Sequence, residues 1–167
     1  MTKETKHVEV KLKAPKVEEI VAKKVIYIRL VGKYSELDFP GTYAKLWGFV
    51  KAKKLFTAGI EHLCVYYDDP NVTESAKLRT EVCLVVHKPV EAEGEIEVKE
   101  LAGGRYARFL YQGPYTNLGA VYDTIFSEWL PESRYEIRDA PVFEKYISNP
   151  ERVAPEKLKT EIYIPVK

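Results

Sequence analysis

Glutamate and tyrosine side chains are the groups in this chain whose types and spacing suit the binding of a charged ligand. Glu144 precedes Tyr146, and Glu161 precedes Tyr163, by two residues each, and the chain has 12 tyrosines. Side chains two residues apart on a β-strand share one face. A carboxylate among aromatic rings suits a flat organic cation, because the rings supply dispersion and cation–π attraction and the carboxylate supplies the counter-charge. We therefore expect these four residues to line one binding surface.

A weaker version of this pattern occurs earlier in the chain. There Tyr66 and Glu81 are expected to join the same ligand-binding surface, while charge and aromatic side chains are concentrated in the later part. A second interpretation stays open. Alternation alone equally allows Glu81 and Glu161 to pair with Lys or Arg side chains on neighbouring strands.

Histidine and cysteine give no comparable pattern. His7, His62 and His87 share no spacing with one another or with a nucleophile, which argues against a hydrolytic triad or a metal site. Cys64 and Cys83 lie 19 residues apart without a CxxC motif, so we interpret them as buried, reduced thiols. We expect neither a metal nor a cofactor.

A repeat with a period of 80 residues organises the elements that must position these groups. Residues 78–86 (LRTEVCLVV) return as residues 158–166 (LKTEIYIPV), and the same offset relates Tyr66 to Tyr146. Such a duplication predicts two similar modules related by a pseudo-twofold axis. The seam between the modules is then the expected place for a small-molecule pocket.

Hydrophobic periodicity assigns the same order of elements to each copy. Runs of β-branched and aromatic residues predict strands, and apolar residues at spacings of three, four and seven predict amphipathic helices. In the second helix Thr116 or Asn117 is the expected N-cap, Pro131 marks the expected end, and Trp129 is a core residue near the seam. The expected strands are residues 17–31, 62–67, 78–87, 95–111, 142–147 and 158–166, and the expected helices are 43–50 and 118–129.

These elements predict an α+β fold built from tandem duplicated β-α-β-β modules with pseudo-twofold symmetry. One helix cannot cover the sheet of its own module, so we expect an antiparallel sheet with both helices on one side and a ligand groove on the other. Residues 1–167 form a single domain in this prediction, with repeats of about 8–88 and 95–167. Carboxylates and tyrosines are expected to gather on the helix-free side.

Composition and charge argue against several classes of partner. Lys and Arg number 26 against 25 Asp and Glu, so the basic field that drives binding to nucleic acid or anionic membranes is missing. No apolar stretch reaches membrane-spanning length, and residues 1–6 contain no signal-peptide core. We expect a cytoplasmic protein that binds neither nucleic acid directly nor a membrane.

The chain resembles the GyrI-like small-molecule-binding domains, which also occur as effector-binding domains of AraC-type and MerR-type transcription regulators. The resemblance covers nearly the whole chain. It implies two modules about a pseudo-twofold axis, with a groove between them that accepts bulky aromatic and cationic compounds. The motifs that carry it follow the family's order: residues 66–70 (YYDDP), 77–79 (KLR), 103–107 (GGRYA), 143–146 (FEKY) and 161–166 (EIYIPV).

The resemblance also implies roles for particular residues. Pocket glutamates of the family lie on the last two strands and match Glu144 and Glu161 here. Some freestanding members sequester drugs, which implies multidrug or xenobiotic binding as the first function. Others hydrolyse cyclopropane-bearing genotoxins, and in that alternative Glu161 activates water as the catalytic residue while Trp129 or Tyr111 positions the substrate.

Two further expectations follow from the family. The member that names it inhibits DNA gyrase, which makes a gyrase-like protein partner a third possible function. Regulators of the family also carry a helix-turn-helix module, and the region before the first expected strand is too short to hold one. We expect this chain not to be a self-sufficient transcription factor.

Overall fold

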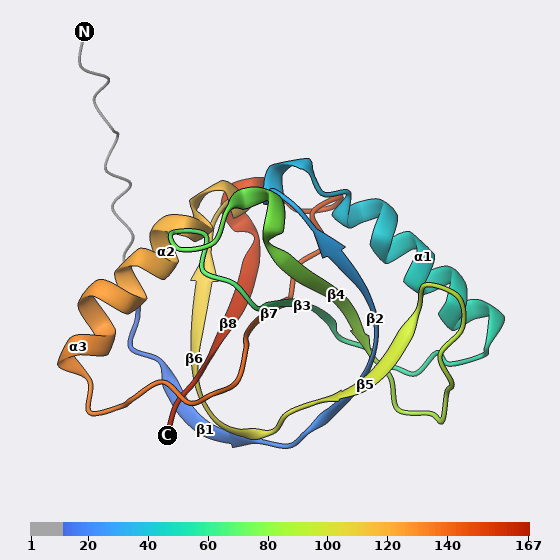
Figure 1. The fold of residues 1–167 in the computed structure, drawn as a ribbon, viewed down its shortest axis with the longest axis horizontal. Helices are drawn as coiled ribbons and strands as arrows, with labels where there is room; N and C mark the ends of the chain where they lie inside the picture. Colours follow the sequence, from blue (N-terminus) through green and yellow to red (C-terminus); the bar gives the residue numbers. More distant parts are fainter. Residues whose placement is uncertain (1–11) are drawn as a thin grey trace, which may run out of the picture.

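A single antiparallel sheet of eight strands forms the centre of the computed structural model, which describes residues 12–167 (Figure 1). The order across the sheet is β1-β6-β8-β7-β3-β4-β2-β5. The strands are β1 (Lys16–Ile20), β2 (Lys23–Val31), β3 (His62–Tyr66) and β4 (Arg79–Val85), followed by β5 (Glu97–Leu101), β6 (Gly104–Gln112), β7 (Val142–Tyr146) and β8 (Lys159–Pro165).

The strand order reads as two halves related by a twofold operation. Strands β1 to β4 of the first half correspond to β5 to β8 of the second, and β3 and β7 meet at the central seam, where Cys64 lies opposite Glu144. The predicted tandem arrangement is confirmed. The start of the first repeat at about residue 8, and His7, lie outside the described residues.

Each half contains one strand more than the predicted β-α-β-β module. The long extended stretch 17–31 divides at Val21 and Ala22 into β1 and β2, and the stretch 95–111 divides at Ala102 and Gly103 into β5 and β6. The two new edge strands are exchanged between the halves: β1 pairs with β6, and β5 pairs with β2.

The two corners that permit this exchange touch one another. A Cβ atom on Gly103 would lie 2.6 Å from the carbonyl oxygen of Ile20, so only glycine fits this crossing point. Gly104 follows with a φ of +124°, which L side chains rarely adopt. The close approach of the first half's own corner thus explains the two adjacent glycines.

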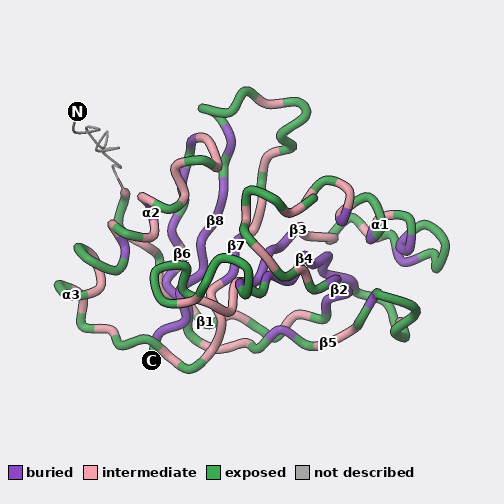
Figure 2. The backbone as a smooth tube through the Cα atoms, turned by 45° about the horizontal axis from the view of Figure 1, so that its top comes forward, coloured by how far each residue is buried: buried purple, intermediate pink, exposed green. Residues whose placement is uncertain are grey.

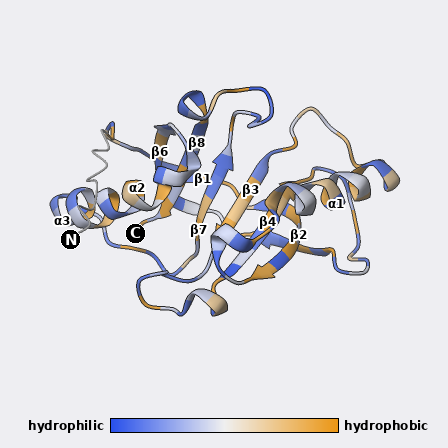
Figure 3. Cartoon of the chain, turned by 90° about the horizontal axis from the view of Figure 1, so that it is seen from above, coloured by the Kyte–Doolittle hydropathy of each residue, from blue (hydrophilic) through white to orange (hydrophobic). Residues whose placement is uncertain are grey.

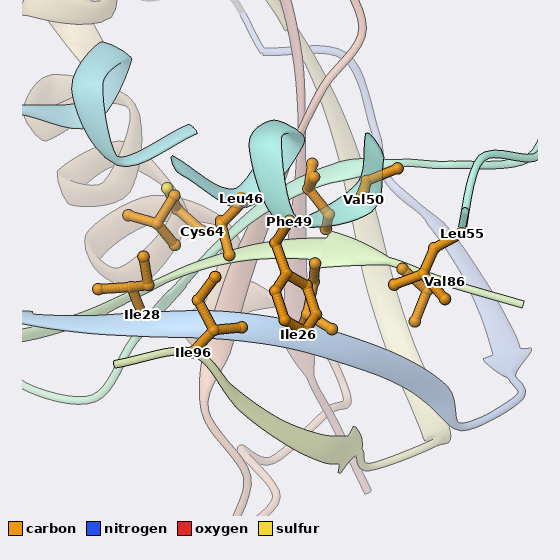
Figure 4. Close-up of a cluster of buried hydrophobic side chains, with 11 residues drawn as sticks. Ile26, Ile28, Leu46, Phe49, Val50, Leu55, Cys64, Val86 and Ile96 are labelled. Atoms are coloured by element: carbon orange, nitrogen blue, oxygen red, sulfur yellow. The ribbon is translucent and has the colours of Figure 1, made fainter. Parts of the chain in front are cut away.

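Helix α1 (Phe39–Ala52) covers the first half of the sheet. It begins at Asp38, whose side chain accepts a hydrogen bond from the Gly41 amide at 2.9 Å, and Pro40 occupies an early position where a missing N–H costs little. Its buried face packs onto β2, β3 and β4, and Figure 4 shows Leu46 beside Cys64, with Phe49 and Val50 above Ile26.

The second helical region covers the other half of the sheet from the same side. It consists of α2 (Leu118–Thr124), a π-helical segment (Ile125–Trp129) and α3 (Leu130–Glu132). Val121 and Ile125 pack against Phe109 and Ile162 of the sheet. The helical region ends at Glu132, one residue after Pro131, so the predicted end is correct to within one residue.

Both helical regions therefore lie on one side of the sheet, as predicted, and form two flanks with the strands between them (Figures 1 and 3). None of the helices in residues 12–167 is long and apolar enough to cross a membrane.

The helix-free face is closed by the curl of the sheet. Apolar side chains from central and outer strands pack together there, including Val25, Leu63, Leu101 and Phe143. Strands β4 and β8 are consequently buried on both faces, and their tubes are almost continuously purple in Figure 2. The ligand groove expected on this face thus coincides with a packed core.

Candidate functional site

Glu144 lies at the centre of a tyrosine cluster on the helix-bearing side of the seam. Its side chain is 2% exposed. Tyr122 donates a hydrogen bond to Oε2 at 2.6 Å, while Tyr146 and Tyr66 donate to Oε1 at 2.7 Å and 3.3 Å. We call Glu144 and these three phenols the Glu144 cluster.

No cation neutralises this carboxylate within residues 12–167, where every ion pair involves other acids. Burial raises the pKa of Glu144 above its ordinary value, and the three phenol donors oppose that rise. Burial also raises the pKa values of Tyr66, Tyr122 and Tyr146 well above normal, so these phenols keep their protons and remain donors. Among the described residues the Glu144 carboxylate is therefore compensated by phenol hydrogen bonds alone.

Two more tyrosines extend the aromatic surface outward from the cluster. Tyr34 meets the ring of Tyr66 edge to face at 5.4 Å, and Tyr115 meets the ring of Tyr146 in the same way at 5.6 Å. Both outer tyrosines come from short 3₁₀ turns, η1 (Tyr34–Glu36) and η3 (Tyr115–Asn117), that precede the two helical regions. All five tyrosines are partly exposed.

The pseudo-twofold axis explains how these residues come together. Tyr34 corresponds to Tyr115, and Tyr66 corresponds to Tyr146, whose hydroxyls lie 3.1 Å apart at the seam. Tyr43 on α1 likewise corresponds to Tyr122 on α2. Six tyrosines thus form three pairs about the axis.

A fourth pair of corresponding residues, at the centre of the cluster, is not identical and breaks this symmetry. Cys64 is the counterpart of Glu144 and lies directly opposite it on the neighbouring strand. Tyr43, the counterpart of Tyr122, therefore has no carboxylate to which it can donate a hydrogen bond. Its hydroxyl donates to the Leu63 carbonyl at 2.6 Å and lies 3.5 Å from the Cys64 sulfur. A symmetric aromatic surface therefore surrounds one carboxylate rather than two.

Glu81 occupies the opposite, helix-free face and is fully compensated. Arg29 donates to it at 2.6 Å, and Lys99 forms a second ion pair with it. Tyr67 adds a hydrogen bond at 2.7 Å. Burial alone would raise the pKa of Glu81, but Lys99, Tyr67 and Arg29 together hold it below the ordinary value.

Glu161 lies on the same helix-free face and is also paired. Arg108 binds it at 2.5 Å, and the same guanidinium binds Glu18 at 3.0 Å. The interpretation in which Glu81 and Glu161 pair with basic side chains of other strands is confirmed.

The prediction that Glu144, Tyr146, Glu161 and Tyr163 share one face is wrong. Glu144 lies opposite Ile162 on β8, whereas Glu161 lies opposite Lys145, and residues directly opposite on antiparallel strands point to the same side. Tyr163 stacks on Phe143 at 4.4 Å in the helix-free core. The structure brings together Glu144, Tyr146 and Tyr66 and separates them from the other predicted residues.

Tyr111 and Trp129 lie in the core of the second half. The Tyr111 hydroxyl donates to the Pro114 carbonyl at 2.9 Å, and Trp129 packs edge to face on Phe109 at 5.0 Å. Both belong to the cluster beneath α2, away from the seam.

Tyr122, Tyr34 and Tyr115 were not among the predicted site residues. Tyr122 belongs to a helical stripe, and a stripe at helical spacing normally indicates core. The repeat itself held the missing signal, since Tyr34 and Tyr115 lie 81 residues apart and Tyr43 and Tyr122 lie 79 apart, close to the period of the strands.

Comparison with known proteins gives a family model and several relatives. A family model described as a GyrI-like small molecule binding domain matches residues 13–167. A DNA gyrase inhibitor from Salmonella arizonae is 30% identical over 149 residues, 87% of this chain and 92% of that protein. The Escherichia coli protein named "Probable transcriptional regulator YgiV" is 31% identical over 103 residues, 61% of this chain and 64% of its own length, which is less than two thirds.

Solved structures share the fold at lower identity. The EcmrR C-terminal domain superposes with a TM-score of 0.73 at 21% identity, over 93% of this chain and 98% of that chain. SAV2435 bound to tetraphenylphosphonium superposes with a TM-score of 0.59 at 18% identity, over 93% of this chain and 94% of that chain. A protein from Listeria innocua described as a hydrolase superposes with a TM-score of 0.61 at 13% identity, over 92% of both chains.

Proposed function

The chain belongs to the family of GyrI-like small-molecule-binding domains, and within that family we propose that it binds bulky aromatic cations at Glu144. The observation that carries this proposal is a buried carboxylate held by phenols and by no cation among the described residues. In this proposal Tyr66, Tyr122 and Tyr146 surround the positive charge, and Tyr34 and Tyr115 contact the aromatic groups of the ligand.

The energetics favour a cation over a neutral ligand. An isolated buried carboxylate loses several kcal/mol of hydration, which phenol hydrogen bonds offset only in part. A ligand cation close to Glu144 interacts in a medium of low dielectric, where its attraction is several times stronger than in water. The surrounding rings add cation–π and stacking energy without demanding one fixed shape. Such a site tolerates chemically different cations, as multidrug and xenobiotic binding requires.

Titration with tetraphenylphosphonium tests the proposal, because that cation is bound to a protein of the same fold. Glu144→Gln keeps the shape of the side chain and removes its charge, and we expect the affinity to fall about 10- to 100-fold. Glu161→Gln is the matched control, a buried glutamate on the opposite face, and its affinity should stay within about two-fold of the unaltered protein. Equal affinities in the Glu144→Gln variant and the unaltered protein would overturn the proposal.

A second candidate function is hydrolysis of cyclopropane-type genotoxins, with Glu144 rather than Glu161 as general base. The raised pKa of Glu144 favours this role, since a base works best when its pKa is near the working pH. Glu161 is engaged by Arg108 instead. Incubation with a cyclopropane-bearing alkylator should yield the ring-opened, water-added product with the unaltered protein and the Glu161→Gln variant, but not with Glu144→Gln. Binding without turnover would reject this activity and leave the first proposal intact.

Inhibition of DNA gyrase, the activity in the name of one relative, is a separate proposal that rests on sequence similarity alone. A supercoiling assay with purified gyrase tests it directly. Unchanged supercoiling at a molar excess of this protein would exclude it.

A further inference from the structure

Four tyrosine rings form a row across the central seam. Tyr34 meets Tyr66 edge to face at 5.4 Å, and Tyr115 meets Tyr146 in the same way at 5.6 Å. The two inner tyrosines join the halves of the row, because their hydroxyls lie 3.1 Å apart. The order is therefore Tyr34, Tyr66, Tyr146, Tyr115, and we call these four rings the tyrosine row.

Glu144 lies at the midpoint of the tyrosine row. Both inner phenols donate to the same carboxylate oxygen, Tyr146 at 2.7 Å and Tyr66 at 3.3 Å. Because the pseudo-twofold axis relates one half of the row to the other, the two outer rings lie on opposite sides of this carboxylate. A positive charge attracted to Glu144 is thus flanked by one outer ring on each side.

Both outer tyrosines are close enough to be affected by the charge of Glu144. Burial, followed by the charges of Asp68 and Glu144, raises the pKa of Tyr34 to about 12. Burial, followed by the charge of Glu144, likewise raises the pKa of Tyr115. The carboxylate therefore acts on both ends of the row, and both outer phenols are neutral at pH 7.

The centre of the row carries one negative charge rather than two. The residue that corresponds to Glu144 in the first half is Cys64, and burial raises the pKa of its thiol to about 12, so it stays neutral at pH 7. Tyr66 and Tyr146 point their protons at Glu144, which turns the lone pairs of their oxygens away from the carboxylate. Aligned hydroxyl dipoles of this kind extend the negative potential of Glu144 to the middle of the row.

We propose that the tyrosine row selects monovalent cations whose charge lies between two aromatic groups, over cations of the same size whose charge lies at one end. This inference rests on the proposed function, because it places the charge of the ligand at Glu144. A central charge lets one aromatic group contact each outer ring, whereas a terminal charge leaves one outer ring without a partner. The ligand class is an ammonium or phosphonium ion with aryl groups on both sides.

Two isomeric cations test this preference. Dibenzyldimethylammonium carries its charge between two phenyl rings, and (biphenyl-4-ylmethyl)trimethylammonium carries the same charge at the end of two linked rings. The isomers share one molecular formula, so charge, mass and number of rings are matched. Calorimetric titration measures both affinities, and we expect the central-charge isomer to bind about five-fold more tightly, the gain of one additional aromatic contact. Without selection by the row, the terminal-charge isomer should bind at least as tightly, because it loses fewer free torsions on binding.

Two variants remove one end of the row each. Tyr34→Leu and Tyr115→Leu should each weaken binding of the central-charge isomer by about three-fold or more, because that isomer contacts both outer rings. The terminal-charge isomer extends to one side, so only one of the two variants should weaken it. Phe56→Leu, at an exposed ring that lies 6.4 Å from the Trp47 ring, is the control and should change neither affinity. The preference compares two ligands on one protein sample, so partial misfolding of a variant does not alter it.

The outcomes separate the two proposals. A central-charge preference that both tyrosine variants reduce supports selection by the row. If Glu144→Gln weakens both isomers, but the unaltered protein shows no central-charge preference or one that neither tyrosine variant reduces, this inference is overturned and the proposed function stands. Binding of tetraphenylphosphonium without binding of the central-charge isomer also overturns this inference alone. Absence of binding by tetraphenylphosphonium and by both isomers would overturn both proposals.

Discussion

The two faces of the sheet each bury a glutamate, and they treat it in opposite ways. On the helix-free face Glu81 has Arg29, Lys99 and Tyr67 as partners. On the helix-bearing face Glu144 has phenol donors and no cation among residues 12–167. The counter-ions hold the pKa of Glu81 below its ordinary value, whereas burial without a counter-ion raises the pKa of Glu144.

The largest effect that tests this comparison is on stability. Glu81→Gln removes the anion from two basic side chains, and we expect the free energy of unfolding to fall by about 2 to 3 kcal/mol, at the low end for a broken buried pair because Arg29 and Lys99 are partly exposed. Glu144→Gln breaks no ion pair and should change stability by less than about 1 kcal/mol. Urea denaturation of both variants measures the difference. Equal losses of unfolding free energy in the two variants would contradict the proposed difference between the two glutamates.

The pH dependence of stability should have opposite signs for the two glutamates. The folded pKa of Glu144 is raised above its ordinary value, so its contribution to stability is present below that ordinary value and is lost as the pH rises through the folded pKa. The folded pKa of Glu81 is lowered, so its contribution is present above the ordinary value and is lost as the pH falls through the folded pKa.

Unfolding free energies measured between pH 4 and pH 8 check these signs. As the pH rises, the penalty of Glu81→Gln relative to the unaltered protein should grow. The stability of Glu144→Gln relative to the unaltered protein should instead improve. Parallel trends in the two variants would show that both carboxylates have the same kind of environment.

A smaller effect on stability is expected at Tyr146, the phenol on strand β7 that donates to Glu144. Tyr146→Phe removes the 2.7 Å hydrogen bond to Glu144, and stability should fall by about 1 to 2 kcal/mol, because a donor to a buried charge is lost. Tyr111→Phe, which loses only a bond to the Pro114 carbonyl, is the control and should cost about 1 kcal/mol or less. Thermal unfolding that ranks the two variants in the reverse order would argue against an ionised Glu144.

The smallest effect is expected at the symmetry-related tyrosine. Tyr66 lies 3.3 Å from the same carboxylate oxygen, a weaker geometry than that of Tyr146. Tyr66→Phe should therefore cost less than about 0.5 kcal/mol, and the same unfolding experiment resolves it from Tyr146→Phe. Equal costs would mean that the two halves hold Glu144 equally.

The sequence predicted an antiparallel sheet, two helical regions and three of the four residues of the Glu144 cluster. It did not predict the division of the two long strands, the role of Tyr122 or the faces on which the glutamates lie. The period of 80 residues located the strands, and the amphipathic spacing of Leu46 and Val50 located the first helix correctly. Strands β4 and β8 are buried on both sides, so apolar alternation carries no information about which side is which. The register of β7 against β8 decides that Glu144 and Glu161 point apart, and a single sequence does not contain this register.

The exchange of edge strands has a consequence for the history of the chain. Neither half closes its own sheet, since β1 completes the second half and β5 completes the first. A single-module ancestor would have worked as a pair of identical subunits, and identical subunits must place the same residue on both sides of their axis. Two copies in one polypeptide need not carry the same residue at corresponding positions, and here Cys64 lies opposite Glu144. A single chain can therefore place one carboxylate at its pseudo-twofold axis, which a symmetric pair of identical subunits cannot do.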